Sequence, residues 1–546
     1  MSFEVTSKDL LGRIGTLETK SGSIETPHLL PVINPLVQPI PPKEILRTFK
    51  CNAIMTNAYL IKKNMKAEAL SKGIHRVLEY DGIVVTDSGA YQILEYGSVE
   101  TQPDEIATFQ EAIGSDIAVI LDVPTGWGTD RAKAEWTVDE TIRRADLTLK
   151  AVSKPDILWE GPIQGGTFLD LVAKAAREMS QRPFAICSLG SPTPIMERYI
   201  FEKLVDMIVT VKMNMPLSKP LHLFGAGHPF MLALVTALGC DLFDSASYAL
   251  FAKQGRYLTE RGTLRLREMQ YFPCSCPVCQ QHTPKDLTEL EKADAEKKLA
   301  EHNLYVCLEE IRSIKQAISE GRLWELVETR ARAHPSLLRA LGAIRKYAEF
   351  IEKHSPTTKR SGLFYLGEHG LSRPEVLRHR IRLLENYQPP ENKRILLLLP
   401  QVHKKPYHTS PQLKALNKIL RTGRTHVCIY GAPYGVVPVE VDDVYPLSQT
   451  ESVTADYETQ RFCVSTVEEY VASSSYETII LHATEDPLSK RLIPTLRRLS
   501  RRQRKKLVVS NGHDSPWSKD ALKRLYETIR RSRPASRCSS SRGRRT

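Results

Sequence analysis

Short apolar stretches alternate with helix-like stretches throughout the first 270 residues, and this alternation limits the fold more than any other feature of the chain. The apolar stretches are rich in Val, Ile and Leu and end in Asp or Gly. They include GIVVTDSG (82–89), DIAVILDV (116–123), PFAICSLG (183–190) and PLHLFGAG (220–227). Strands that alternate with helices form parallel sheets joined by crossover connections. The sequence therefore predicts an α/β fold.

A doubly wound sheet and a closed barrel both fit this alternation. A dinucleotide-binding doubly wound sheet carries a GxGxxG turn after an early strand, and the sequence has no such turn. Functional residue types recur at strand ends at least five times. A β/α barrel places its catalytic groups at the carboxyl ends of its strands. We therefore predict a (β/α)8 TIM-type barrel.

Three aspartates directly follow apolar strands: Asp87 in VVTDSGAYQ, Asp122 in VILDVPTG and Asp244 in CDLFDSASY. A carboxylate at a strand end can act as nucleophile, as general acid or base, or as an acceptor for the edge of a base. Cleavage of an N-glycosidic bond uses two carboxylates, because the sugar carbon becomes oxocarbenium-like. Any one of these aspartates could instead cap the following helix. The three together indicate a functional site.

Other polar and aromatic residues follow the same strands. Gln164, in IQGG (163–166), can donate to and accept from a purine edge, and the two glycines allow close approach of the backbone to a ligand. Tyr91 could stack on a planar base or simply pack. His228, in GAGHP (225–229), is interpreted as structural rather than catalytic.

A cysteine cluster, PCSCPVC, is followed by a histidine on a helix-like segment. The predicted ligands are Cys274, Cys276, Cys279 and His302. Three thiolates and an imidazole suit tetrahedral Zn²⁺, and four protein ligands leave no position for water, so the zinc is expected to be structural. Cys307 and His282 are alternative fourth ligands. A zinc deaminase is disfavoured because its His-x-Glu motif is absent.

Composition divides the 546-residue chain into four predicted regions. These are a barrel (1–270), a zinc-binding subdomain with closing helices (271–353), a smaller α+β region (354–496) and a basic tail (497–546). The third region includes the strand KRILLLLP (393–400). The tail begins with RRLSRRQRKK, seven basic residues in ten positions, and ends in a Ser/Arg-rich stretch. We expect this tail to be disordered.

The charge balance and the cysteine usage indicate the partner and the compartment. Lys and Arg exceed Asp and Glu by 13, which favours a polyanionic partner such as nucleic acid. No apolar run approaches the roughly 20 residues of a membrane helix, and MSFEVTSKDL does not resemble a secretory signal. The ten cysteines are spread over the whole chain with one tight cluster, which does not indicate a disulfide framework. We expect a cytoplasmic protein.

The ordered set of motifs resembles the tRNA-guanine transglycosylase family. TDSGAYQ, LDVPTG, IQGG, HLFGAGHP, DLFDSASYAL and CSCPVC occur in the order and spacing of that family over about residues 8–310. FGAGHP and DSASYAL, with the long C-terminal extension, resemble the archaeal branch. The resemblance implies exchange of the guanine at position fifteen of the tRNA D-arm for 7-cyano-7-deazaguanine, the precursor of archaeosine, with no organic cofactor.

The resemblance also implies roles for single residues. Asp244 would attack the ribose and form a covalent ribosyl-enzyme, and Asp87 would act as general acid/base, although the two are treated as a pair. Asp122 and Gln164 would read the base edge, and Tyr91 would stack on its face. The backbone around Cys187 would close the pocket. The implied partners are tRNA, 7-cyano-7-deazaguanine and a second copy of the chain.

The chain departs from the archaeal pattern in two places. No small β-barrel is predicted after residue 505, so we expect the tRNA-binding PUA domain of that branch to be missing or supplied by a separate protein. The segment LLPQVHKKPYHTSP (398–411) is similar to a cysteine-bearing segment of archaeosine synthase but lacks the cysteines. An archaeosine synthase-like paralogue and a non-catalytic tRNA-binding subunit are the alternative functions.

Overall fold

A computed structural model describes residues 3–90, 101–420, 424–511 and 515–532. The chain forms two compact units, Met1–Pro356 and Thr357–Thr546, and each is described by itself. Within the described residues, no helix is long and apolar enough to cross a membrane.

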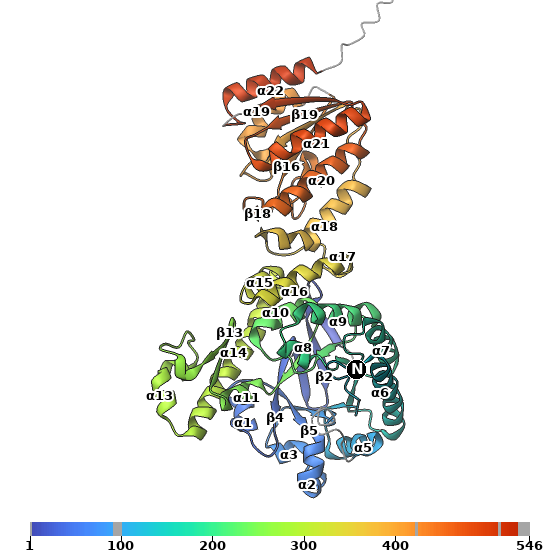
Figure 1. Ribbon diagram of the computed structural model, residues 1–546, viewed down its shortest axis with the longest axis vertical. Coiled ribbons are helices and arrows are strands. Elements are labelled where there is room, and N and C mark those ends of the chain that lie inside the picture. The colour runs from blue at the N-terminus through green and yellow to red at the C-terminus, as the bar shows by residue number, and fades with distance from the viewer. Residues whose placement is uncertain (1–2, 91–100, 421–423, 512–514, 533–546) are drawn as a thin grey trace, which may run out of the picture. The chain divides into compact units, whose positions relative to one another are not determined.

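The first unit is built around a closed barrel of parallel strands, as the sequence predicts. The strands follow one another around the barrel in chain order, and the last pairs with the first. They are β4 (His28–Ile33), β5 (Ala53–Asn57), β6 (Ile83–Asp87), β7 (Ile117–Val119), β8 (Leu158–Ile163), β9 (Ile186–Leu189), β10 (Leu221–Leu223) and β11 (Leu242–Ser245). Helices surround the strands (Figure 1). The helices that follow the barrel strands are α1 (Pro42–Arg47), α2 (Ala58–Lys72), α3 (Ile74–Leu78), α5 (Pro103–Ile113), α6 (Arg131–Ala151), α7 (Leu169–Gln181), α8 (Thr193–Glu197), α9 (Phe201–Asn214), α10 (Pro229–Ala237) and α11 (Ser247–Lys253).

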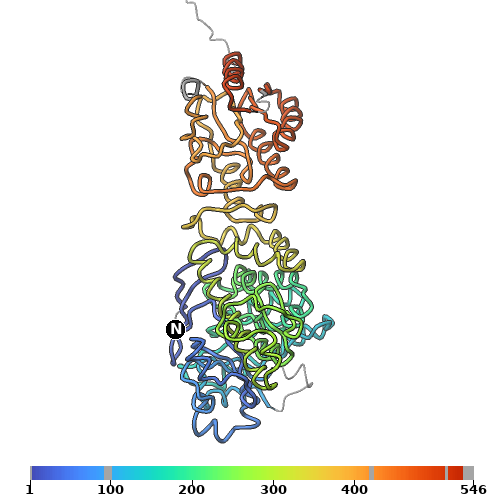
Figure 2. The backbone as a smooth tube through the Cα atoms, turned by 90° about the vertical axis from the view of Figure 1, so that its left-hand side faces the viewer, coloured from blue at the N-terminus to red at the C-terminus, as the bar shows by residue number. Residues whose placement is uncertain are grey.

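An antiparallel sheet precedes the barrel and covers the amino ends of its strands. Its strands are β1 (Phe3–Asp9), β2 (Gly12–Thr19) and β3 (Gly22–Thr26). Leu17 and Ile24 of this sheet join the apolar cluster inside the barrel, next to Ile83 at the start of β6. Figure 2 shows these first strands in dark blue. Because this end is covered, the carboxyl ends of the strands remain available for a site.

The segment after the barrel packs against the same core. It contains β12 (Arg256–Thr259), β13 (Gly262–Arg265), η1 (Leu266–Glu268), α12 (Pro277–Gln281), α13 (Pro284–Glu289), α14 (Lys292–Glu320), α15 (Leu323–Ala331), α16 (Pro335–Ala343), η2 (Ile344–Tyr347) and α17 (Ala348–His354). The apolar cluster outside the barrel strands continues through these helices to Ile351. The segment with the cysteine cluster and the closing helices therefore belong to the barrel unit.

The second unit contains an open five-stranded sheet in the order β17-β16-β15-β19-β20, in which only β17 is antiparallel. Its main strands are β15 (Ile395–Pro400), β16 (Thr425–Gly431), β17 (Gly435–Pro438), β19 (Thr478–Ala483) and β20 (Lys506–Asn511), and β14 (Leu363–Tyr365) pairs with β18 (Thr450–Ser452). Its helices are η3 (Glu368–Ser372), α18 (Pro374–Ile381), η4 (Arg382–Asn386), η5 (Tyr407–Thr409), α19 (Pro411–Leu420), η6 (Val439–Val441), α20 (Tyr457–Ser473), α21 (Pro487–Gln503) and α22 (Lys519–Arg531). Leu397 and Leu396 enter different apolar clusters, because both faces of β15 are buried.

The prediction of a disordered tail from residue 497 is wrong over the described residues. Arg497 lies inside α21, β20 pairs with β19, and α22 follows. The prediction rested on the basic residues and overlooked the helical spacing of the leucines. Leu492, Leu496 and Leu499 are buried, while the arginines between them face solvent. The expected tail beyond residue 532 lies outside the described residues.

Candidate active site and metal site

Polar residues from three neighbouring strands and from β11 meet at the carboxyl end of the barrel. Asp87 is the last residue of β6, Asp122 follows β7, Gln164 follows β8, and Asp244 lies near the end of β11. Because all strands of the barrel are parallel, these ends lie at one edge. The structure therefore brings together four of the residues that the sequence predicts.

Asp122 and Gln164 form a buried pair with a fixed orientation. Gln164 Nε2 donates to Asp122 Oδ2 at 2.5 Å. Gln164 Oε1 accepts hydrogen bonds of 2.9 Å from the Thr125 amide and from the Ser191 hydroxyl, so the amide cannot be flipped without loss of these contacts. Burial raises the pKa of Asp122 to about 6, although the Gln164 hydrogen bond opposes this shift. The pair presents a preoriented carboxylate.

Gly190, directly after β9, is the glycine that this pair requires. A Cβ atom at Gly190 would lie 2.1 Å from Gln164 Nε2, so any other residue would displace the amide. The sequence predicts that the backbone around Cys187 closes the pocket, and this stays a prediction. Cys187 lies within β9, and its side chain is buried in the cluster outside the barrel strands. The strand runs two residues beyond Cys187, so Gly190 is the residue that directly follows it.

Asp87 lies close to several carboxylates. Asn57 Nδ2, at the end of β5, donates to Asp87 Oδ2 at 3.1 Å. Burial, together with the negative charges of Asp122 and Asp244, raises the pKa of Asp87 to about 7. A carboxyl group with a pKa near neutrality can both give and take a proton at physiological pH. This is the property that a general acid/base needs.

Asp244 is held by a buried imidazole that the sequence analysis missed. His222 Nε2 lies 3.2 Å from Asp244 Oδ1, and His222 Nδ1 lies 2.9 Å from Glu160 Oε1. The Gly225 amide also donates to Asp244 Oδ1 at 2.8 Å. Burial lowers the pKa of His222, but Glu160 and Asp244 outweigh this effect and raise it to about 10. A cationic imidazole therefore links two carboxylates. The only sequence signal was a charged or polar residue inside two apolar strands.

Two further predicted residues have different outcomes. Tyr91 lies outside the described residues. His228 is structural, as predicted: its side chain caps α10, and its Nε2 lies 3.0 Å from the Thr263 hydroxyl. Burial lowers the pKa of His228 to about 3. His228 is therefore a neutral capping residue.

Comparison with known proteins identifies the family. A family model described as "Queuine tRNA-ribosyltransferase" matches residues 8–336. The chain belongs to this family. A relative from Methanocaldococcus jannaschii named "tRNA-guanine(15) transglycosylase" is 46% identical over 83% of this chain and 68% of its own length. One from Pyrobaculum aerophilum with the same name is 44% identical over 90% of this chain and 98% of its own length. A domain of unknown function matches residues 376–529.

Four side chains of this transglycosylase-family chain could hold a metal ion. The donor atoms of Cys274, Cys276, Cys279 and His302 lie within 4.8 Å of one another. Two bonds of about 2.3 Å to one Zn²⁺ ion span roughly 4.6 Å. His302 Nε2 lies 3.0 Å from the Leu258 carbonyl, so this nitrogen carries the proton and Nδ1 faces the thiols. The four donors therefore fit a single tetrahedral metal ion.

The two alternative ligands are not part of this group. The Cys307 thiol is buried and donates to the Gly227 carbonyl at 3.4 Å. His282 is absent from the metal-binding group among the described residues. The ring of Tyr257 stacks on His302 with centroids 3.6 Å apart, and its hydroxyl lies 3.3 Å from Cys279 Sγ. This aromatic contact holds the histidine in position.

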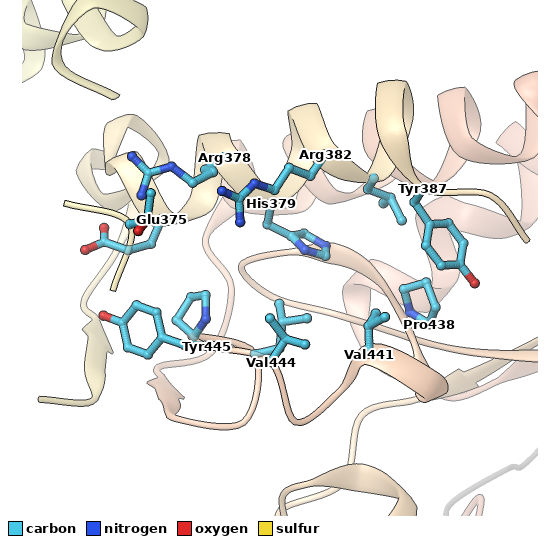
Figure 3. Close-up of a pocket in the computed structure, with 13 residues that line it drawn as sticks. Glu375, Arg378, His379, Arg382, Tyr387, Pro438, Val441, Val444 and Tyr445 are labelled. Atoms are coloured by element: carbon cyan, nitrogen blue, oxygen red, sulfur yellow. The ribbon is translucent and has the colours of Figure 1, made fainter. Parts of the chain in front are cut away.

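The second unit of this transglycosylase-family chain contains a pocket of about 180 Å³ between α18 and residues 438–447 (Figure 3). Glu375 pairs with Lys359 at 2.6 Å, and His379 Nε2 donates to the Val436 carbonyl at 2.7 Å. Burial disfavours the charge of Glu375, but Lys359 and Arg373 hold its pKa at about 2. These polar groups stabilise the unit itself, so the barrel is the better candidate for catalysis.

Proposed function

We propose that this chain is a tRNA-guanine transglycosylase that exchanges the guanine at position fifteen of tRNA for 7-cyano-7-deazaguanine. The observation that carries the proposal is the set of four polar groups at one barrel edge, inside the segment that matches the family. The relatives named tRNA-guanine(15) transglycosylase support the position in tRNA. The positive net charge supports a polyanionic substrate.

In the first half-reaction, Asp244 Oδ2 attacks C1′ of the ribose and the glycosidic bond breaks. We assign Oδ2 because the described contacts of this carboxylate, from Gly225 and His222, fall on Oδ1. The bonding electrons pass to N9 of guanine, and the proton of Asp87 neutralises the leaving base. A covalent ribosyl-enzyme results, as in other double-displacement reactions at an anomeric carbon.

The second half-reaction reverses these steps with the new base. Asp87, now ionised, takes the N9 proton of 7-cyano-7-deazaguanine, and N9 attacks C1′. The bond from C1′ to Asp244 breaks, and the carboxylate is regenerated. One base replaces another, so neither an oxidant nor an energy source is needed. The near-neutral pKa of Asp87 suits a group that must give and then take a proton.

Recognition of the base falls to Asp122, oriented by Gln164. The N1 and N2 hydrogens of guanine are donors, and a carboxylate is a matching acceptor. The Gln164 amide and its partners Thr125 and Ser191 fix where this carboxylate lies. We also propose that Tyr91, which lies outside the described residues, stacks on the base.

His222 is proposed as a positioning residue for the nucleophile. Its imidazole, held by Glu160, places a positive charge beside Asp244 in a pocket that also contains Asp87 and Asp122. Without this charge, four carboxylates would face one another at short range, and like charges disfavour ionisation. The imidazole therefore places a compensating positive charge 3.2 Å from the carboxylate that attacks.

The metal site is proposed to hold a structural Zn²⁺ ion. Thiolate and imidazole ligands favour this metal, and a site closed by four protein ligands leaves no position for substrate. When bound, zinc contributes folding energy to the segment between β13 and α14, and no catalytic step depends on it.

Incubation of the protein with unmodified tRNA and radiolabelled 7-cyano-7-deazaguanine tests the proposal. We expect up to one label per tRNA, with release of one guanine, and digestion should place the label at position fifteen. A tRNA with adenine at that position is the control and should remain unlabelled. Absence of both label and guanine release would reject the activity, whereas label at another position would reject the proposed specificity.

A further inference from the structure

A second cavity, of about 200 Å³, adjoins the base-reading pair at the mouth of the barrel. It is lined by residues from the loops after β7, β8 and β9 and from α9, including Thr125, Trp127, Gly166, Ser191 and Lys203. Thr125 and Ser191 also donate to Gln164 Oε1, so the cavity shares its wall with the pocket proposed for the target base. Small-molecule sites usually have volumes of roughly 300–1,000 Å³. The size fits one unit of a polymer better than a separate metabolite.

Trp127 is an exposed aromatic residue flanked by two cations. Its side chain is 42% exposed. The Arg198 guanidinium lies 5.2 Å from its ring centroid, and Lys203 Nζ lies 5.9 Å from it. Arg198 donates to the Pro194 carbonyl at 3.1 Å. Neither cation forms an ion pair with a carboxylate in the part of the chain that the structure describes. Both charges therefore remain available to an anionic ligand.

This combination matches the chemistry of one nucleotide. Aromatic side chains stack on bases with little sequence preference, and Lys and Arg neutralise the adjoining phosphates. Arg131, at the start of α6, is by contrast already paired with Asp170 at 2.6 Å. The cavity spans the ends of β7, β8 and β9, with Gln164 following the middle strand of the three.

We propose that Trp127, Arg198 and Lys203 form a subsite for the nucleotide that adjoins the target guanine on the tRNA strand. The base of this nucleotide stacks on Trp127, and its phosphates lie against the two cations. The subsite rests on the proposed function, because it presupposes a tRNA substrate. It holds the strand next to the nucleotide that must leave its stack to enter the barrel, a step that costs stacking energy.

Trp136 provides a matched control. It is 48% exposed on α6, and Lys133 Nζ lies 3.8 Å from its ring centroid, yet it does not line the cavity. Base exchange is measured at varied tRNA and at varied free base for wild type, Trp127→Ala, Trp127→Phe and Trp136→Ala. We expect Trp127→Ala to raise the KM for tRNA about tenfold or more, with the KM for the free base unchanged. Trp127→Phe should retain most of the tRNA affinity, and Trp136→Ala should behave as wild type.

The two cations are tested by tRNA binding at several salt concentrations. The double variant Arg198→Ala/Lys203→Ala should flatten the slope of log K against log salt by about 0.7 to 0.9 for each lost phosphate contact. Trp127→Ala should weaken binding without changing this slope. Equal effects of Trp127→Ala and Trp136→Ala would overturn the subsite, as would an equal rise in the KM for the free base. Wild type without any exchange would instead reject the proposed function.

Discussion

Both units of the chain contain parallel strands, yet their carboxyl edges differ in chemistry. In the barrel, Asp87, Asp244 and the Asp122–Gln164 pair meet at one edge. In the open sheet of the second unit, Asp486 follows β19 and caps α21 by accepting from the Ser489 amide at 3.0 Å. A closed barrel brings all its strand ends to one place, whereas an open sheet spreads them along a line. The comparison assigns catalysis to the first unit.

The two units also differ in the charged groups that they present. The carboxyl edge of the barrel gathers carboxylates and one cationic imidazole. The second unit presents an exposed basic face on the last turns of α21, formed by Arg497, Arg498, Arg501 and Arg502. Lys505, from the same sequence run, is not part of this face, because its ammonium donates to the Val471 and Ser474 carbonyls at 2.6 Å. We expect the first unit to react with the tRNA and the second to hold it.

Of the changes considered, removal of the nucleophile should have the largest effect on base exchange. Asp244→Ala should reduce base exchange by on the order of 10⁴-fold or more, because the covalent route loses its attacking group. Binding of tRNA should persist. The matched control is Asp443→Ala, which removes an exposed carboxylate from the second unit and should leave exchange intact. Exchange assays and tRNA titrations with both variants check this, and comparable losses would contradict the assignment.

Loss of the positioning charge should have the next largest effect. Glu160→Gln and His222→Asn should each lower kcat by about 10²- to 10³-fold, with a smaller change in the KM for tRNA. The double variant should be little worse than either single variant, because both act through one contact. His75→Gln is the control, since His75 forms a similar 3.2 Å pair with Asp116 before the start of β7. Additive effects, or unchanged kcat in folded Glu160→Gln, would contradict the role.

The pKa of Asp87 predicts the pH dependence of the first half-reaction. Asp87 must be protonated to release guanine, and its pKa is raised to about 7 by burial and by Asp122 and Asp244, with Glu160 contributing. Guanine release in a single turnover should therefore be fast below pH 7 and fall about tenfold per pH unit above it. Asp87→Asn should be slow and insensitive to pH in this range. A wild-type rate that rises through pH 7 would assign the proton to another group.

Loss of a metal ligand should lower the thermal stability of the protein more than the rate of base exchange. Cys276→Ser should lower the zinc content and reduce the Tm by several degrees, because a closed site contributes folding energy. Well below that Tm, exchange should remain near the wild-type rate. Metal analysis and thermal unfolding check this, with Cys428→Ser, a buried thiol in the second unit, as a control for thiol loss. Less than half an equivalent of zinc in wild type would contradict the assignment.

Removal of charge from the basic face of α21 should have the smallest of these effects. Arg501→Ala/Arg502→Ala should weaken tRNA binding by about three- to tenfold and flatten its salt dependence by about 0.7 to 0.9 per lost contact. The KM for the free base should not change. Lys285→Ala/Lys292→Ala removes two exposed charges from the first unit as the control. Superimposable titrations for the two double variants would mean that this face does not hold tRNA.

Much of the barrel and its edge could be predicted from sequence, because strand ends in a parallel barrel share one edge. The sequence alone was therefore sufficient to predict four residues of the site, Asp87, Asp122, Gln164 and Asp244. Glu160 and His222 were not predicted, because the contact between them joins β8 to β10 across the closed barrel. These two residues are 62 positions apart in the sequence. Gly190 was not predicted because an apolar run does not show where its strand ends. The helix α21 was not predicted because the basic residues were given more weight than the helical spacing of the leucines.

The most direct test of the account is to identify the residue that carries the ribose. Wild type is mixed with tRNA in the absence of a second base, quenched in denaturant and digested with nuclease and protease. Mass spectrometry then locates the nucleotide-bearing peptide. The account predicts a nucleotide on Asp244 and none on Asp87, with the adduct lost in Asp244→Ala. A nucleotide on Asp87, or steady exchange by Asp244→Ala, would contradict it.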